Sequence, residues 1–204
     1  GMLAAAPDLG GLGAYLARIF GPFDFASVTL TLPTETFTGT LGLDVGGRRV
    51  VLHEVGPAHT RGDVIVEVPD ASVVFTGDIC FNGIHPVMWS GPVGNWIAAC
   101  DRVPAMGPRT VVPGHGPVCG PAAVAELRDY LVWLRNEARA RYEAGMTVAE
   151  AARDIRLDDY ASWGDPERVV VNVATLYREF GATEVPDTVG LLAEMAAFRN
   201  GLDN

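Results

Sequence analysis

Three short segments of the chain carry residue types that could bind a metal ion. They contain His59, Asp78 and His115, and each follows a run of apolar, β-branched residues that predicts a buried strand. Histidine nitrogens and carboxylate oxygens suit zinc, iron or manganese, and side chains at strand ends can converge from distant sequence. Taken singly, a histidine or a Gly-Asp pair in a turn is more often an ordinary polar residue. The shared pattern favours one metal site.

A second set of candidates lies in the segment 79–95, which has no clear helical or strand periodicity. Long irregular loops are often functional, so we predict that His85 and Trp89 bind substrate. Simple exposure of His85 and core packing of Trp89 are the alternatives. His53, inside an expected strand, is predicted to be structural. The cysteines form no C-x-x-C pair and are expected to be buried thiols: Cys80, Cys100 and Cys119.

The three segments also carry a family resemblance. They read Gly56-Pro-Ala-His59-Thr-x-Gly-Asp63, Phe75-Thr-Gly-Asp78 and Val112-Pro-Gly-His115-Gly. In this order and spacing they resemble the third, fourth and fifth metal-binding motifs of the metallo-β-lactamase-fold hydrolases. The resemblance runs from about residue 14 to 136, and the helical tail is similar to that of one bacterial branch of the superfamily.

The resemblance implies an αββα sandwich with a two-metal site between its sheets. His59 would bind the first metal, Asp78 would bridge both and act as the catalytic residue, and His115 would bind the second. A bridging hydroxide would attack, while the metals polarise the scissile carbonyl or phosphoryl group. The implied cofactor is zinc, as one or two ions, with iron or manganese as alternatives. Asp63 is predicted to cap the turn rather than to support a ligand.

The chain departs from the family pattern at one point. His53 is its first histidine, so the His-x-His-x-Asp-His motif, which supplies two ligands to each metal in the family, is missing. Each metal would keep two protein ligands, one of them shared, whereas catalytic zinc normally has three. We therefore expect metal binding to be incomplete or absent and hydrolytic activity to be impaired in this chain alone.

The periodicity of the sequence predicts the elements that position these residues. A helix is expected over 9–20, followed by strands and then by helices. The Gly46-Gly47 pair predicts a tight hairpin, and Thr147 with Glu150 forms a capping box. Asn95 and Asp165 are expected as helix caps. The expected strands are 28–32, 36–45, 49–55, 64–68, 72–76 and 110–112, and the later helices are 95–102, 124–141, one starting at 147, 166–180 and 188–198.

These elements predict a layered α/β (α+β) fold of the metallo-β-lactamase-like αββα type, truncated at its N-terminus and followed by a helical tail. Residues 1–120 would form the partial metallo-β-lactamase-like domain, and residues 121–204 a helical region packed on it. Missing strands would leave a sheet edge and an apolar face uncovered. We therefore expect a homodimer that covers them.

The composition narrows the partners and the location. The 204 residues include 15 Lys and Arg against 25 Asp and Glu, a formal net charge of −10, which disfavours nucleic acid as a partner. No apolar run is long enough to span a membrane, and no signal peptide is recognisable, so we expect a cytoplasmic protein. The predicted function is hydrolysis of a small-molecule ester, thioester, lactone or amide. The alternative is a non-catalytic remnant that serves as a binding or interaction module.

Overall fold

The computed structural model describes residues 8–25 and 27–202. The chain forms two compact units. The sheet unit, Phe37–Val185, holds every predicted site residue, and the helix-pair unit consists of Gly1–Thr36 and Pro186–Asn204. The predicted division at residue 120 stays a prediction, and helices on both sides of it lie in the sheet unit. Residues 1–7, 26, 203 and 204 of the predicted regions lie outside the described residues.

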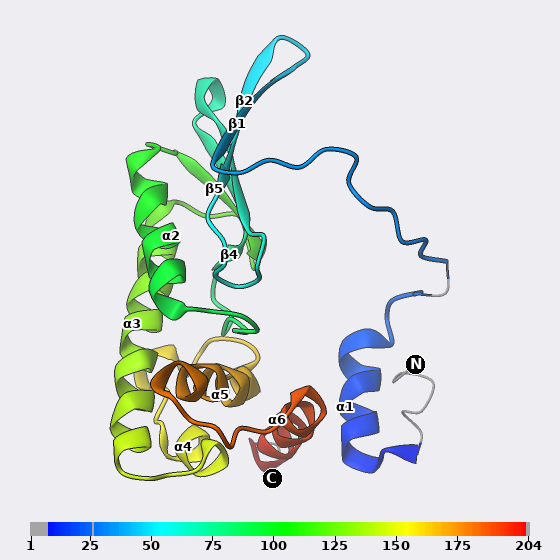
Figure 1. The fold of residues 1–204 in the computed structure, drawn as a ribbon, viewed down its shortest axis with the longest axis vertical. Coiled ribbons are helices and arrows are strands. Elements are labelled where there is room, and N and C mark those ends of the chain that lie inside the picture. The colour runs from blue at the N-terminus through cyan, green and yellow to red at the C-terminus, as the bar shows by residue number, and fades with distance from the viewer. Residues whose placement is uncertain (1–7, 26, 203–204) are drawn as a thin grey trace. The chain divides into compact units, whose positions relative to one another are not determined.

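A five-stranded sheet in the order β1-β2-β3-β4-β5 forms the centre of the sheet unit (Figure 1). Neighbouring strands are antiparallel except β4 and β5, which are parallel. Gly46 and Gly47 have φ of 63° and 82°, so the predicted tight hairpin joins the first two strands. The strands are β1 (Thr40–Val45), β2 (Arg48–Glu54), β3 (Val64–Val68), β4 (Val73–Phe81) and β5 (Thr110–His115).

The two faces of this sheet differ in how far their side chains are buried. Cross-strand register places Val51, Ile65, Val74 and Val111 on one face, and all four are buried. The opposite face is also apolar, but Leu43 and Phe75 on it are 42% and 43% exposed. Of the two sheets of an αββα sandwich, the described residues supply one.

Helices pack on the buried side of the sheet unit. Two of them, α2 (Val93–Ala105) and α3 (Pro121–Glu143), contact each other and β4, while α3 and α4 (Val148–Asp154) contact α5 (Val169–Phe180) (Figure 1). The predicted capping box of Thr147 and Glu150 opens α4. Single 3-10 turns complete the unit: η2 (Pro69–Ala71), η3 (Asp158–Tyr160) and η4 (Pro166–Arg168). This mixture of sheet and helices confirms the predicted α/β class, with its helical tail.

Three local predictions are wrong. Asn95 is not a cap, because α2 begins at Val93 and the Asn95 side chain donates to the carbonyl of Pro57 instead. Asp165 precedes η4 but makes no capping hydrogen bond; its carboxylate pairs with Arg168. Residues 28–32 form no strand, since no strand of the described part of the chain pairs with them.

The helix-pair unit is described by itself. It contains α1 (Gly10–Phe20), close to the predicted helix, and α6 (Thr188–Leu202), and these two helices contact each other. Buried residues on their facing sides include Leu16 and Leu191. Among the described residues, no helix has both the length and the apolar character needed to cross a membrane.

Candidate functional site

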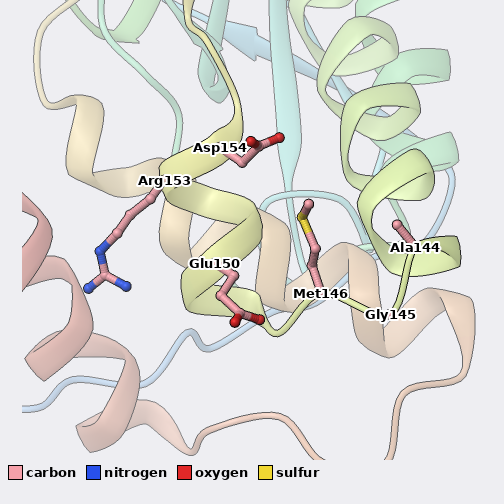
Figure 2. A pocket seen from close by; sticks show the side chains of 6 residues that line it. All are labelled: Ala144, Gly145, Met146, Glu150, Arg153 and Asp154. Atoms are coloured by element: carbon pink, nitrogen blue, oxygen red, sulfur yellow. The ribbon is translucent and has the colours of Figure 1, made fainter.

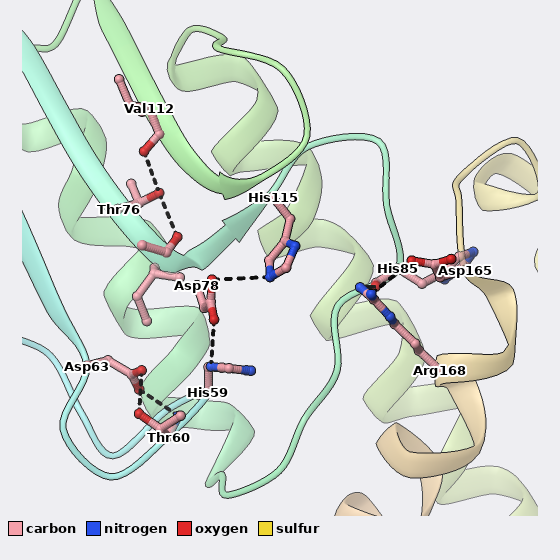
Figure 3. A network of polar contacts seen from close by, with 12 residues as sticks. His59, Thr60, Asp63, Thr76, Asp78, His85, Val112, His115, Asp165 and Arg168 are labelled. Carbon is pink, nitrogen blue, oxygen red and sulfur yellow. Dashed lines mark hydrogen bonds and ion pairs between the residues drawn. The ribbon is translucent and has the colours of Figure 1, made fainter. Parts of the chain in front are cut away.

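His59, Asp78 and His115 come from three separate segments and lie close together in the structure (Figure 3). Asp78 lies in β4, His115 ends the neighbouring parallel strand β5, and His59 lies in the loop between β2 and β3. The Asp78 carboxylate is 3.5 Å from His59 Nδ1 through Oδ2 and 3.4 Å from His115 Nε2 through Oδ1. One carboxylate therefore stands between two imidazoles that are 56 residues apart in sequence.

The loop that carries His59 is shaped by Asp63. One carboxylate oxygen of Asp63 accepts from the backbone N–H groups of Ala58 and Thr60 at 3.2 and 2.9 Å, and the other accepts from the Thr60 hydroxyl at 2.8 Å. A side chain at Gly56 would come within 2.7 Å of the Arg61 carbonyl oxygen. The hydrogen bonds confirm that Asp63 caps the turn and so fixes the direction of His59.

His59 is buried without a hydrogen-bond partner. It is 7% exposed, and neither ring nitrogen makes a hydrogen bond among the described residues. Trp96 packs edge-on against the ring, with the centroids 5.5 Å apart. Burial lowers the pKa of His59, and the charges of Asp78 and Asp63 oppose that change only in part. The ring is thus held in its neutral form, with a lone pair available to a Lewis acid.

His115 is fixed by an aromatic stack and by the backbone around it. Its ring stacks on the Phe81 ring, with the ring centroids 4.4 Å apart. Asn82 donates its backbone N–H to the His115 carbonyl and its side-chain amide to the Pro117 carbonyl, both at 2.9 Å. A Cβ at Gly114 would collide with Asp78 Oδ1. The glycine beside His115 is therefore what allows β5 to approach the carboxylate.

The three side chains are of types that bind metals, but they do not form a complete set of ligands in the described residues. Two imidazoles and a carboxylate are suitable donors, and the unpartnered nitrogens of His59 fit a metal ligand. Within residues 8–25 and 27–202, however, no group of three or more His, Cys, Asp or Glu side chains is arranged so that it could hold a metal ion. The structure brings the three predicted ligands close together, and their role as ligands stays a prediction.

His85 lies in a different environment. It is fully buried, with Nδ1 3.0 Å from the Tyr130 hydroxyl and Nε2 3.1 Å from the Tyr160 carbonyl oxygen, and Trp163 packs edge-on against it. Burial lowers the pKa of His85 to about 4. In this arrangement both ring nitrogens are engaged within the protein. Its predicted contact with substrate remains a prediction.

The remaining candidates differ in how far they match the predictions. Trp89 is 44% exposed, on the loop between β4 and α2. Its predicted role in substrate binding is untested. His53 binds Glu67 across the sheet at 2.8 Å, as expected of a structural histidine. The three cysteines are free. Cys80 and Cys100 are buried as predicted, and burial raises the pKa of both thiols, that of Cys100 to about 12. Cys119 is only partly buried, so the prediction of a buried thiol is wrong for this residue.

A row of polar side chains on the helical tail, the polar row, was not predicted from the sequence. Four side chains at positions i, i+4, i+7 and i+11 bind main-chain atoms of the loop 85–93. Arg168 donates to the His85 carbonyl, Asn172 binds the Pro86 carbonyl and the Met88 N–H, Thr175 donates to the Met88 carbonyl, and Glu179 accepts from the Val93 N–H. The helical spacing of these polar residues inside a valine-rich run is the signal that could have revealed the row.

Two hollows of the sheet unit are not lined by His59, Asp78 or His115. One of about 630 Å³ lies between the end of α3 and α4 and is lined by Ala144, Gly145, Met146, Glu150, Arg153 and Asp154 (Figure 2). Another of about 250 Å³ lies between the end of β2 and α2. Neither includes a residue predicted to bind metal or substrate.

Comparison with known proteins gives a consistent picture. A family model of the metallo-beta-lactamase superfamily matches residues 5–115, more than half of the chain. No curated protein matches it. Among solved structures, the inverting sec-alkylsulfatase Pisa1 from Pseudomonas sp. aligns with a TM-score of 0.57 at 18% identity, over 76% of this chain and 28% of its own. A metallo-beta-lactamase family protein from Thermus thermophilus aligns with a TM-score of 0.57 at 16% identity, over 91% of this chain and 65% of its own. At these identities both show the fold alone.

Proposed function

Because this chain belongs to the metallo-β-lactamase superfamily, we propose that it carries the His59, Asp78 and His115 side of a metal-dependent hydrolytic site. The proposed substrates are small molecules with an ester, thioester, lactone or amide bond. The chain spans 28% of the alkylsulfatase that it resembles in fold, so that protein's substrate is not transferred to it.

The observation that carries this proposal is the ring of His59, which makes no hydrogen bond among the described residues and has the Asp78 carboxylate 3.5 Å from Nδ1. Both of its nitrogens are buried without a hydrogen bond, although leaving a buried polar group unpaired costs about 1 to 3 kcal/mol. Trp96, Phe81 and the turn capped by Asp63 hold the ring in this position. An electron-pair acceptor bound beside Asp78 would satisfy His59, whereas a purely structural histidine gains nothing from this placement.

Each residue has a distinct part in the proposed site. His59 and His115 supply imidazole nitrogens from opposite sides, and the Asp78 carboxylate lies between them. A divalent metal bound there, with zinc as our first choice, would polarise the scissile group and make water a better nucleophile near neutral pH. Since catalytic zinc normally has three protein ligands, we propose that further ligands come from outside these three residues.

Replacement of His59 by alanine tests the proposal. We expect the full chain to bind zinc and the His59→Ala variant to bind it roughly tenfold or more weakly, because one donor is lost. Zinc is measured by elemental analysis after gel filtration, together with titration against a chelating indicator. Hydrolysis is assayed on one model ester, thioester, lactone and amide.

The control is His53→Ala. It also removes a histidine of the sheet unit, but one whose Nε2 already pairs with Glu67. It should bind zinc like the unchanged chain. Equal zinc binding by both variants would contradict the assignment of His59.

The alternative is a non-catalytic binding or interaction module. It is favoured by the finding that no complete set of metal donors occurs in the described part of the chain. This alternative predicts no zinc above background in the unchanged chain and no hydrolysis of any of the four model substrates. The same measurements therefore distinguish the two functions.

We also propose that two copies of the chain associate. Within the described residues β1 pairs only with β2, so its outer edge is available for another strand. The apolar side chains Leu43 and Phe75 on the adjoining face are substantially exposed. A homodimer that covers this edge and face accounts for both features.

A further inference from the structure

Arg168 has a fixed position that the proposed hydrolytic site does not use. One terminal nitrogen donates to the His85 carbonyl at 3.0 Å, and the other pairs with the Asp165 carboxylate at 2.8 Å. Asp165 itself has a φ of 57°, a left-handed conformation that Asp tolerates better than most residues. The Arg168 side chain is 20% exposed. The guanidinium group is therefore held in place by two contacts, and the side chain as a whole is not fully buried.

The guanidinium group lies beside the candidate site. Its central carbon is 5.8 Å from the centroid of the Phe81 ring, and that same ring stacks on His115. Figure 3 shows the Arg168 side chain extending from its helical segment towards the side where His115 and Asp78 lie. Arg168 thus places a cation at the border of the site.

The contacts of Arg168 leave donors for another partner. A guanidinium group has five N–H donors in a rigid plane, and the two contacts engage one on each terminal nitrogen. Asp165 balances the charge in part, but its contact occupies one terminal nitrogen only. A planar, always protonated group with donors to spare is the side chain best suited to an oxyanion.

We propose that Arg168 binds an oxyanion group of the substrate, a carboxylate or a sulfate or phosphate ester, and so selects anionic substrates. The location of the bond to be cleaved rests on the function proposed for His59, Asp78 and His115. The chain is acidic overall, so a fixed cation with unused donors at the border of the site gives an anionic molecule one preferred position. Arg168 is a substrate-binding residue in this scheme and takes no part in bond cleavage.

Anion binding by the full chain tests the proposal, with sodium sulfate and sodium acetate as probes. Both are titrated calorimetrically in the presence of a metal chelator, and the two anions distinguish tetrahedral from planar oxyanions. We expect Arg168→Gln to weaken binding of the preferred anion by about tenfold or more, since charge-assisted hydrogen bonds are lost. Arg168→Lys should give an intermediate value, because it keeps the charge but loses the planar fork.

Arg141→Gln is the matched control. The Arg141 side chain is 18% exposed and pairs with Glu137 and Asp154 on the far part of the helical tail, so its loss removes the same charge from a similar setting. Unchanged anion affinity in Arg168→Gln, or an equal loss in Arg141→Gln, would overturn the proposal. If Arg168→Gln does not fold, a folded Arg168→Lys decides: weakened binding supports the proposal, and unchanged binding overturns it.

The outcome is independent of zinc binding. Because the chelator removes free metal, an intact anion site can be found in a chain that binds no zinc, and zinc can bind to a chain with no anion site. Failure of the His59 experiment and failure of the Arg168 experiment are therefore separate results.

Discussion

His59 and His85 show how two buried histidines of one chain can differ in what their ring nitrogens meet. His85 has both nitrogens satisfied, by a tyrosine hydroxyl and a main-chain carbonyl, inside a cluster of aromatic rings. His59 has neither satisfied and borders a carboxylate. Their chemical difference lies in their neighbours, since both are held neutral by burial.

The lowered pKa of His85 predicts how stability depends on pH. Its pKa in the folded chain is about 4, below the ordinary value of 6.5, so the unfolded chain takes up a proton first as the pH falls. The free energy of unfolding should therefore decrease through pH 6.5 and continue to decrease towards pH 4. Between pH 7 and pH 5 we expect His85 to account for a loss of about 2 kcal/mol.

Chemical unfolding of the unchanged chain and of His85→Gln at both pH values measures this contribution. The variant keeps a polar side chain but cannot be protonated in this range, so its loss of stability between pH 7 and pH 5 should be smaller by that amount. An equal pH dependence in the two proteins would show that His85 is protonated in the folded chain.

At the scale of elements, the polar row of Arg168, Asn172, Thr175 and Glu179 fixes the loop between β4 and α2. Asn172 is fully buried and satisfies two main-chain groups at once, the Met88 N–H at 2.7 Å and the Pro86 carbonyl at 2.9 Å. This part of the helical tail therefore acts as a support for the loop that carries Trp89.

Replacing Asn172 by leucine should detach the loop from α5. The variant leaves a buried N–H and a buried carbonyl unpaired, so we expect the free energy of unfolding to fall by about 3 kcal/mol. Hydrogen exchange at the Met88 amide should become faster, because its acceptor is gone.

Thr175→Val is the comparison, since it keeps the shape of the side chain and removes only the hydrogen bond to the Met88 carbonyl. Its loss of stability should be smaller than that of Asn172→Leu. Unchanged exchange at Met88 in Asn172→Leu would mean that the loop holds its position without the row.

Local sequence signals predicted the elements well. Gly46 and Gly47 marked the hairpin, and Thr147 with Glu150 marked the start of α4, because turn and cap preferences act over a few residues. The alternation in residues 28–32 predicted a strand that did not form, since a strand needs a partner that alternation alone cannot supply.

The site could be foreseen only in part for a related reason. The predicted strands before His59, Asp78 and His115, together with the family motifs, were enough to predict their proximity. The structure places His59 in a loop, Asp78 inside β4 and only His115 at a strand end. The burial of His85 depends on Tyr130 of α3, and Arg168 reaches the loop from a segment much later in the sequence. Contacts of this range leave no pattern within the segment 79–95 itself.

At the scale of the whole molecule, the uncovered edge and face of the sheet make association the main prediction. We expect light scattering to give twice the mass of one chain. Leu43→Lys should shift the protein towards monomer, because it places a charge on the edge strand and on the exposed apolar face. The side chain is 42% exposed, so the folded single chain should tolerate the change.

Val118→Lys is the matched control, a more exposed apolar residue outside the sheet. It should leave the mass unchanged. A monodisperse monomer of the unchanged chain would contradict the homodimer, and so would a dimer that survives Leu43→Lys intact.

Except at Gly91, where a side chain would collide with Glu179, the hydrogen bonds of the polar row to residues 85–93 depend only on main-chain carbonyl and N–H groups. The hydrogen bonds that hold the loop therefore do not depend on most of the side chains that the loop carries. Val87, Trp89 and Ser90 can be exchanged without removing a hydrogen bond of the row. The loop can therefore be rewritten for a different ligand on an unchanged scaffold, by natural selection or by a designer.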